Sequence, residues 1–256
     1  MINVFHSPLS VFAISFATLW ASAWFGAGIL RRRWGLQQDE REDFGVILGA
    51  TPTLLALLIG FSFSMAINRY DQRKNLEEAE ANAIGTEYFR ADLLATPNAE
   101  KVRALLRAYA RERILFYLAS DRQQLQEINQ RTVALQGQLW AATVDSAAAQ
   151  PTPIVALAVS GMNDVINAQG FVQAAWWNRI PAEAWVLMLV IAAACNLLVG
   201  FNIRSVKSRS ILRLMVFPLV IAISLYLIAD IDSPRRGLIR VVPQNLSVLV
   251  DAIGKP

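Results

Sequence analysis

Residues 44–67 read FGVILGATPTLLALLIGFSFSMAI, and none of their side chains carries a charge. The hydrocarbon core of a bilayer is about 30 Å thick, and a helix needs roughly 20 apolar residues to cross it. Three further stretches have the same character: 9–30, 184–203, and a shorter one between Arg213 and Asp230 that contains Pro218. We therefore predict four membrane-spanning helices, the fourth of them short and interrupted by its proline.

The composition also points to a membrane protein. Of the 256 residues, 55% are hydrophobic and only 17% are charged, whereas a soluble domain carries about 25% charged residues. The net charge is +4, and arginines gather beside the hydrophobic segments, as in Arg31–Arg33. This placement favours contact with anionic lipid headgroups over nucleic acid. We expect a lipid bilayer around the chain and no nucleic-acid partner.

The first hydrophobic segment has a second interpretation, as a cleaved signal peptide. Small residues at Ala21, Ser22 and Ala23 have the spacing of a cleavage site. However, residues 1–10 contain no Lys or Arg, and a signal peptide begins with positive charge. The arginines after the segment are typical of a membrane anchor, so we favour a first transmembrane helix.

Most of the charge lies in residues 68–182, between the second and third segments. Apolar residues recur there at helical spacing, with breaks at Pro97 and at Pro151 and Pro153. The pattern predicts helices over 71–94, 99–118, 122–143 and 154–177. The fold class is therefore an all-α integral membrane protein, divided into a first helix pair (1–67), a helical soluble region (68–182), a second helix pair (183–230) and a C-terminal tail (231–256).

Charge alone does not decide the orientation in the membrane. The two short loops hold dense clusters of Arg and Lys, which favours placing them in the cytoplasm. The opposite ends of the spans carry an equal number of basic residues, so the counts do not separate the two orientations.

The residues of common catalytic and metal sites are absent from the sequence. The chain has one histidine, His6, and one cysteine, Cys195, which together cannot form a zinc site. It contains no phosphate-binding GxxxxGK[ST] loop, GxSxG elbow or HExxH motif. We predict that the protein is not an enzyme and has no catalytic residue, metal site or cofactor.

The second segment has two unlike faces when it is placed on a helix at about 100° per residue. One face is largely leucine and isoleucine, and the other gathers small and polar residues with two bulky apolar ones. Helix packing is the simpler interpretation, because Gly45 and Gly49 form a GxxxG pair. The alternative is a pore-lining helix in which Leu57 and Phe61 form an apolar constriction. We call the second face the small-residue stripe: Gly49, Ala50, Thr53, Leu57, Gly60, Phe61, Ser64 and Asn68.

The helix expected after this segment is rich in charge. The simpler interpretation is a solvated face with pairs such as Glu87 and Arg90, three residues apart. The alternative is a ring of polar groups at the mouth of a pore, formed by Glu80, Asn82 and Arg90.

Two stretches resemble the bestrophin-like family of bacterial membrane proteins. They are GFSFSMAINRYDQRKNLEEAEANAIGTEYFRADLL at 60–94 and IADIDSPRRGLIRV at 228–241. Gly60-Phe61, followed by Arg69 and an aromatic residue, is more remotely similar to the pore-helix motif of the bestrophins themselves. The order of two spans, a helical region and two spans extends the resemblance over nearly the whole chain.

The resemblance implies a function and a set of site residues. Bestrophins are homopentameric anion channels with a cytoplasmic helical region, and three residues of the second span form their neck. Carried onto this sequence, the neck is Thr53, Leu57 and Phe61. All three lie on the small-residue stripe, and we expect its members Gly60, Ser64 and Asn68 to complete the pore lining.

We therefore expect a pentameric channel for small inorganic anions such as chloride in the bacterial inner membrane, with residues 68–182 in the cytoplasm. The alternative is a non-conducting membrane scaffold or sensor that acts through those residues.

The chain departs from the bestrophins after the last span. Some bestrophins bind calcium through acidic residues there, but a hard cation requires six to eight oxygen ligands. Asp230 and Asp232, beside the turn 233–237, are too few to supply them. We expect these aspartates to pair with nearby arginines or to cap the helix turn.

Overall fold

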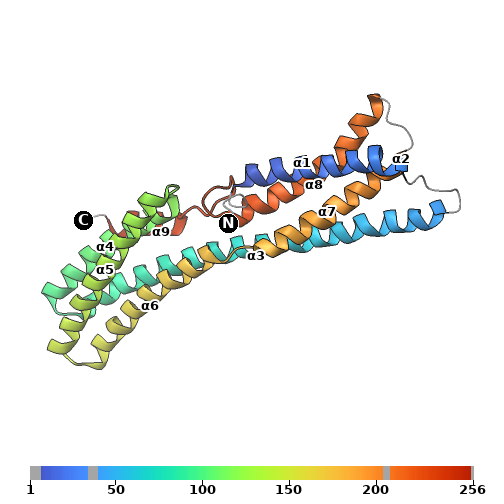
Figure 1. The fold of residues 1–256 in the computed structure, drawn as a ribbon. Coiled ribbons are helices and arrows are strands. Elements are labelled where there is room, and N and C mark those ends of the chain that lie inside the picture. Colours follow the sequence, from blue (N-terminus) through green and yellow to red (C-terminus); the bar gives the residue numbers. More distant parts are fainter. Residues whose placement is uncertain (1–6, 34–39, 204–207, 255–256) are drawn as a thin grey trace. The chain divides into compact units, whose positions relative to one another are not determined.

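The computed structural model describes residues 7–33, 40–203 and 208–254 as helices joined by turns (Figure 1). His6 and the short-loop residues 34–39 and 204–207 lie outside the described residues. The chain divides into two compact units. The first comprises Met1–Asn68 and Arg179–Ile239, and the second comprises Arg69–Asn178 and Arg240–Pro256.

The first unit contains helices that are long and apolar enough to cross a membrane. The helix α1 (Pro8–Phe25) continues through a short π-helix, η2 (Gly26–Leu30), into α2 (Arg31–Arg33). It packs against both α7 (Ala182–Asn202) and α8 (Ser208–Asp232). The fourth spanning element of the unit is the first part of α3 (Glu40–Arg90), and the described chain thus has the four predicted spanning helices.

Glycines set the closest crossing in this unit. A Cβ atom on Gly26 would overlap the backbone carbonyl of Leu197 in α7, and one on Gly200 would overlap the carbonyl of Ala23 in α1. Small residues let helix backbones approach closely inside a membrane, where van der Waals packing drives helix association. These two glycines therefore fix where η2 and α1 meet α7.

The predicted interruption of the fourth span by Pro218 is wrong. The helix α8 runs for 25 residues with Pro218 inside it. A proline removes one backbone hydrogen bond, and membrane helices tolerate this loss where their surroundings re-satisfy the freed backbone group. The apolar part of α8, Leu214–Asp232, therefore forms one element.

The aspartates at the end of α8 bind backbone amides, as the capping interpretation predicts. Asp232 accepts hydrogen bonds at 3.2 Å from the backbone N–H of Ile180. Asp230 accepts from the N–H groups of Leu238 at 2.7 Å and Ile239 at 2.9 Å. Both aspartates are buried. Asp232 ties the end of α8 to the segment before α7, and Asp230 holds the turn that follows α8.

The second unit is a helical bundle. It consists of the rest of α3, the 3-10 turn η3 (Ala91–Leu93), α4 (Thr96–Leu118), α5 (Arg122–Ala149), α6 (Pro153–Trp177) and α9 (Gln244–Ile253). Asp121 caps α5 by accepting from the N–H groups of Gln123 at 2.9 Å and Gln124 at 3.1 Å, and Thr152 caps α6. A cap oxygen satisfies amides that have no partner within the helix.

Two features of this bundle differ from the sequence-based prediction. The helix α5 extends beyond the predicted end at residue 143, through an alanine-rich stretch of high helix propensity. The short helix α9 was not predicted at all. Its N–H at Leu246 and the side-chain amide of Asn245 both donate to Glu77 of α3, at 2.9 Å and 2.6 Å.

Candidate pore-lining helix

The helix α3 is one element of 51 residues, and its apolar part belongs to the first unit. On this part, Leu55 and Ala66 are buried by the rest of the chain, at 2% and 0% exposure. Both residues lie on the leucine-rich face that the helical pattern separates from the small-residue stripe. The leucine-rich face therefore packs against the rest of the chain.

All eight residues of the small-residue stripe are exposed in the single chain. The two bulky members are among the most exposed, Leu57 at 54% and Phe61 at 68%. The stripe also exposes Thr53, Gly60, Ser64 and Asn68, so the neck positions implied by the resemblance and the lining positions expected from the helical pattern share one uncovered surface.

Polar groups on the stripe are only partly satisfied by the helix itself. The Thr53 hydroxyl donates to the backbone carbonyl of Gly49 at 2.9 Å. Among the described residues, no side-chain hydrogen bond involves Ser64 or Asn68. A polar group without a partner in hydrocarbon costs several kcal/mol. The stripe thus suits a neighbouring helix or water better than lipid tails.

The glycines in the membrane-spanning part of α3 do not act as close-packing sites within the chain. A Cβ atom on Gly45, Gly49 or Gly60 would meet no other atom within 4 Å. Gly26 and Gly200, in contrast, have no room for a Cβ. The GxxxG packing interpretation is therefore not realised inside one copy of the chain.

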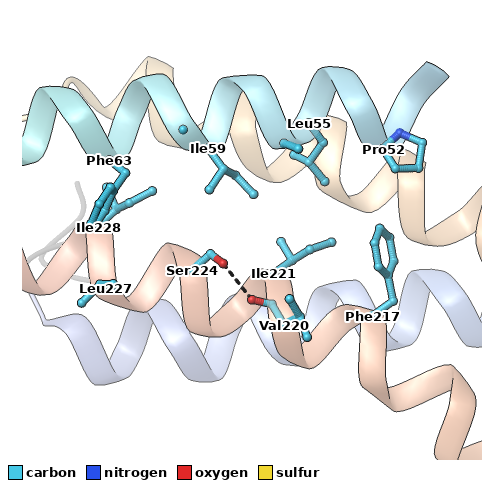
Figure 2. A pocket seen from close by; sticks show the side chains of 12 residues that line it. Pro52, Leu55, Ile59, Phe63, Phe217, Val220, Ile221, Ser224, Leu227 and Ile228 are labelled. Carbon is cyan, nitrogen blue, oxygen red and sulfur yellow. Dashed lines mark hydrogen bonds between the residues drawn. The ribbon is translucent and has the colours of Figure 1, made fainter. Parts of the chain in front are cut away.

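The other side of α3 lines an apolar groove with α8 (Figure 2). Its volume is about 410 Å³, and Leu55, Ile59 and Phe63 face Phe217, Ile221 and Ile228 across it. The Ser224 hydroxyl in the wall donates to the carbonyl of Val220 at 3.0 Å. The groove therefore offers no strong polar recognition. On this side, α3 packs less closely against its own chain than α1 does.

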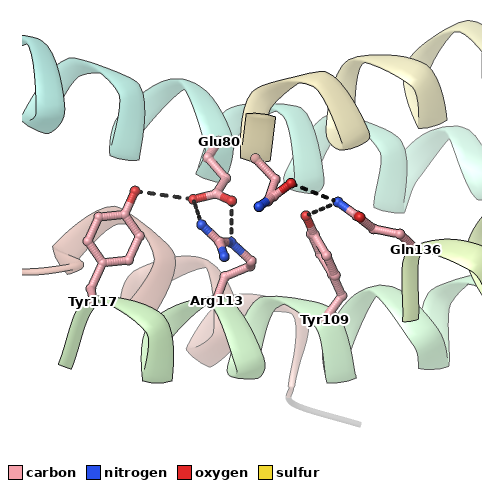
Figure 3. A network of polar contacts seen from close by, with 6 residues as sticks. Glu80, Tyr109, Arg113, Tyr117 and Gln136 are labelled. Atoms are coloured by element: carbon pink, nitrogen blue, oxygen red, sulfur yellow. Dashed lines mark hydrogen bonds and ion pairs between the residues drawn. The ribbon is translucent and has the colours of Figure 1, made fainter. Parts of the chain in front are cut away.

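Glu80, an expected pore-mouth residue, lies in a buried polar network of the second unit (Figure 3). Its carboxylate accepts from Arg113 Nε at 2.5 Å and from the Tyr117 hydroxyl at 3.2 Å. Burial disfavours the charge on Arg113, but Glu80 offsets this and raises the pKa of the guanidinium. Burial, reinforced by Glu80, also raises the pKa of Tyr117. The ion pair of Glu80 and Arg113 is therefore enclosed in the bundle, and its two charges balance each other.

The other polar residues expected after the second span lie in different environments. Asn82 is exposed, whereas Arg90 is partly buried, with Nη1 4.0 Å from Asp164 Oδ2. Glu87 is fully buried, so the predicted solvated pair of Glu87 and Arg90 is wrong. Both Glu80 and Glu87 lie in the interior of the bundle and not on a solvated helix face.

Sequence reasoning also missed Arg113 and Tyr117 as partners of Glu80. A signal was present, because Arg113 falls between the apolar positions Tyr109 and Phe116 on the buried face of α4. A charge at such a position requires a buried partner.

The fold and the site together define a class of protein: a four-span α-helical membrane protein whose second spanning helix exposes a stripe of small and polar residues. The family model of the bestrophin-like domain matches residues 11–246. The chain therefore belongs to the bestrophin-like family.

Solved structures agree with this assignment at the level of the fold. One variant of a bacterial bestrophin homologue from Klebsiella pneumoniae shares 12% identity with a TM-score of 0.68, covering 96% of this chain and 95% of that one. Another structure of that homologue gives 11% identity, a TM-score of 0.64 and the same coverages. A structure described only as a membrane protein gives 10% identity and a TM-score of 0.68, covering 95% of this chain and 99% of that one. Among curated proteins, no significant match was found.

Proposed function

We propose that the protein is the subunit of an oligomeric ion channel in which α3 lines the pore. The observation that carries the proposal is the uncovered small-residue stripe on a membrane-spanning helix. Hydrocarbon is a poor environment for the side chains of Thr53, Ser64 and Asn68. Copies of the chain arranged around an axis would instead turn these side chains toward water.

The family supports a particular type of channel. Resemblance to the bestrophins favours a pentamer and small inorganic anions such as chloride. It also favours the bacterial inner membrane as the location, with the second unit in the cytoplasm. The basic net charge of +4 is compatible with an anionic permeant.

The neck of this pore would be Thr53, Leu57 and Phe61, and Gly60, Ser64 and Asn68 would complete the lining. Leu57 and Phe61 are the apolar members, so they would form the dewetting constriction. Asn82, exposed beyond the span, and Arg90 are the remaining candidates for the mouth. Glu80 does not enter the proposal, because Arg113 and Tyr117 occupy its carboxylate.

Chloride flux through purified protein in liposomes tests the proposal. Under a chloride gradient, Phe61→Ala should raise the flux several-fold over wild type, because it removes the bulkiest apolar group of the constriction. Leu58→Ala is the matched control, since it removes apolar volume from the same turn on the face away from the stripe.

Unchanged flux in Phe61→Ala, with an intact oligomer, would contradict the neck assignment. Sealed vesicles for wild type and both variants, again with a folded oligomer, would favour the non-conducting scaffold or sensor. In that case the second unit should capture a protein partner, and the stripe would serve only as a packing surface between copies.

A further inference from the structure

Glu87 is a carboxylate enclosed between two helices of the second unit. The residue has 0% exposure, and neither carboxylate oxygen has a hydrogen-bond partner. A buried charge without a partner is strongly unfavourable, so such a group tends to take up a proton instead. Glu80, on the same helix, has partners that Glu87 lacks.

The space for Glu87 is provided by a glycine on the facing helix. A Cβ atom on Gly161 of α6 would overlap Glu87 Oε2 and lie 2.6 Å from Arg90 Nη1. The carboxyl group therefore lies directly on the backbone of α6. A change in the size or hydration of the carboxyl group therefore alters the contact between α3 and α6.

Two charged groups act on Glu87, one from each helix. Arg90 follows one turn later on α3, and Asp164 follows Gly161 on α6. Arg90 Nη1 lies 4.0 Å from Asp164 Oδ2, so the guanidinium is close to two carboxyl groups. Burial raises the pKa of Glu87 to about 8, with Asp164 adding to the rise and Arg90 opposing it.

We propose that Glu87 is a proton-binding switch at the contact between α3 and α6. With the proton bound, the neutral carboxyl group closes the contact over Gly161. When the proton is released to water, the charged carboxylate attracts Arg90 away from Asp164. The contact over Gly161 then loosens.

The direction of the pH dependence follows from the raised pKa. A carboxyl group whose pKa is higher in the folded protein stabilises the fold fully below its ordinary pKa, near 4.5. That contribution is lost as the pH rises through about 8. The contact between α3 and α6 is therefore closed at neutral and acid pH and loosens in mildly alkaline solution.

A second consequence rests on the proposed function. The helix α3 continues without a break from the small-residue stripe to Glu87. If α3 lines the pore, a change in its contact with α6 would alter the ion flux. The flux would then change with pH at the same midpoint as the protonation of Glu87.

Infrared spectroscopy of the full-length protein in lipid tests the switch directly, because a protonated carboxyl group has its own carbonyl stretching band. We expect one band that disappears with a midpoint near pH 8 in wild type and is missing in Glu87→Gln. Glu78→Gln, at an exposed position of the same helix, should retain it. A midpoint below pH 6, or a band that survives Glu87→Gln, would overturn the proposal.

Asp164→Asn provides an independent variant at an exposed site, where folding is not at risk. Removing this negative charge should move the midpoint to lower pH, and an unmoved midpoint would contradict the assigned geometry. Flux measured on the same samples separates the two proposals. If the band titrates but no variant conducts, the switch stands and the channel function fails.

Discussion

Single residues in the second unit show two ways of burying an acid. Glu80 is held by Arg113 and Tyr117, so its charge is balanced inside the bundle. Glu87 has no such partner and relies on a proton. The difference has opposite consequences, because removing Arg113 leaves the Glu80 charge uncompensated, whereas Glu87→Gln keeps the neutral state that Glu87 already has at neutral pH.

Arg113→Met should destabilise the fold by about 3–5 kcal/mol, since it leaves the Glu80 carboxylate buried and unpaired. The measurement is the free energy of unfolding in detergent by denaturant titration. The double variant Glu80→Leu with Arg113→Met removes both charges and should lose much less. A single variant as stable as wild type would contradict the buried pair.

The sequence did not place these acids correctly, and the reason lies at this scale. Glu77, Glu80, Ile84 and Glu87 follow at intervals of three and four, which is the spacing of a buried helix face. The pattern does not reveal that Glu77 and Glu80 are buried, because their partners lie elsewhere in the chain, on α9 and α4. One sequence does not reveal such distant pairings.

Among the elements, α1 and α3 use glycine in opposite ways. Gly26 and Gly200 bring η2, α1 and α7 into backbone contact, whereas Gly45, Gly49 and Gly60 of α3 face open space. Close packing in the first unit is therefore concentrated on α1, and α3 retains one uncovered face and a groove behind it.

Gly26→Ala should lower the stability of the first unit by about 1–3 kcal/mol or more, because the added methyl overpacks the crossing with α7. Gly28→Ala, two residues later in the same π-helix, has no atom within 4 Å of its Cβ and should be tolerated. Thermal unfolding of the two variants in detergent compares them. Equal melting temperatures would show that the crossing is not as close as described.

The elements themselves were largely predictable. Hydropathy reveals the spans because a bilayer requires long uncharged helices, and Pro97, Pro151 and Pro153 mark breaks in the bundle. The prediction that Pro218 interrupts the fourth span is wrong because a membrane helix tolerates one missing backbone hydrogen bond. The helix α9 was overlooked although Leu246, Leu249, Val250 and Ile253 have helical spacing, since ten residues give a weak signal.

For the whole molecule, the family and the fold were accessible from two specific stretches of sequence. The role of the small-residue stripe was not, because no other part of the described chain covers it. Packing and pore lining require the same small side chains, and only water on the stripe distinguishes them.

Cysteine accessibility on α3 tests the pore-lining claim most directly. In a Cys195→Ser background, single cysteines replace stripe residues (Thr53, Leu57, Phe61, Ser64) or residues of the other face (Leu55, Leu58, Ile59), and a charged, water-soluble thiol reagent is applied to the protein in liposomes. We predict that the stripe cysteines react and that the reaction changes chloride flux, whereas the other face stays protected. Protection of the stripe in a folded oligomer, or equal reaction on both faces, would contradict a pore lined by α3.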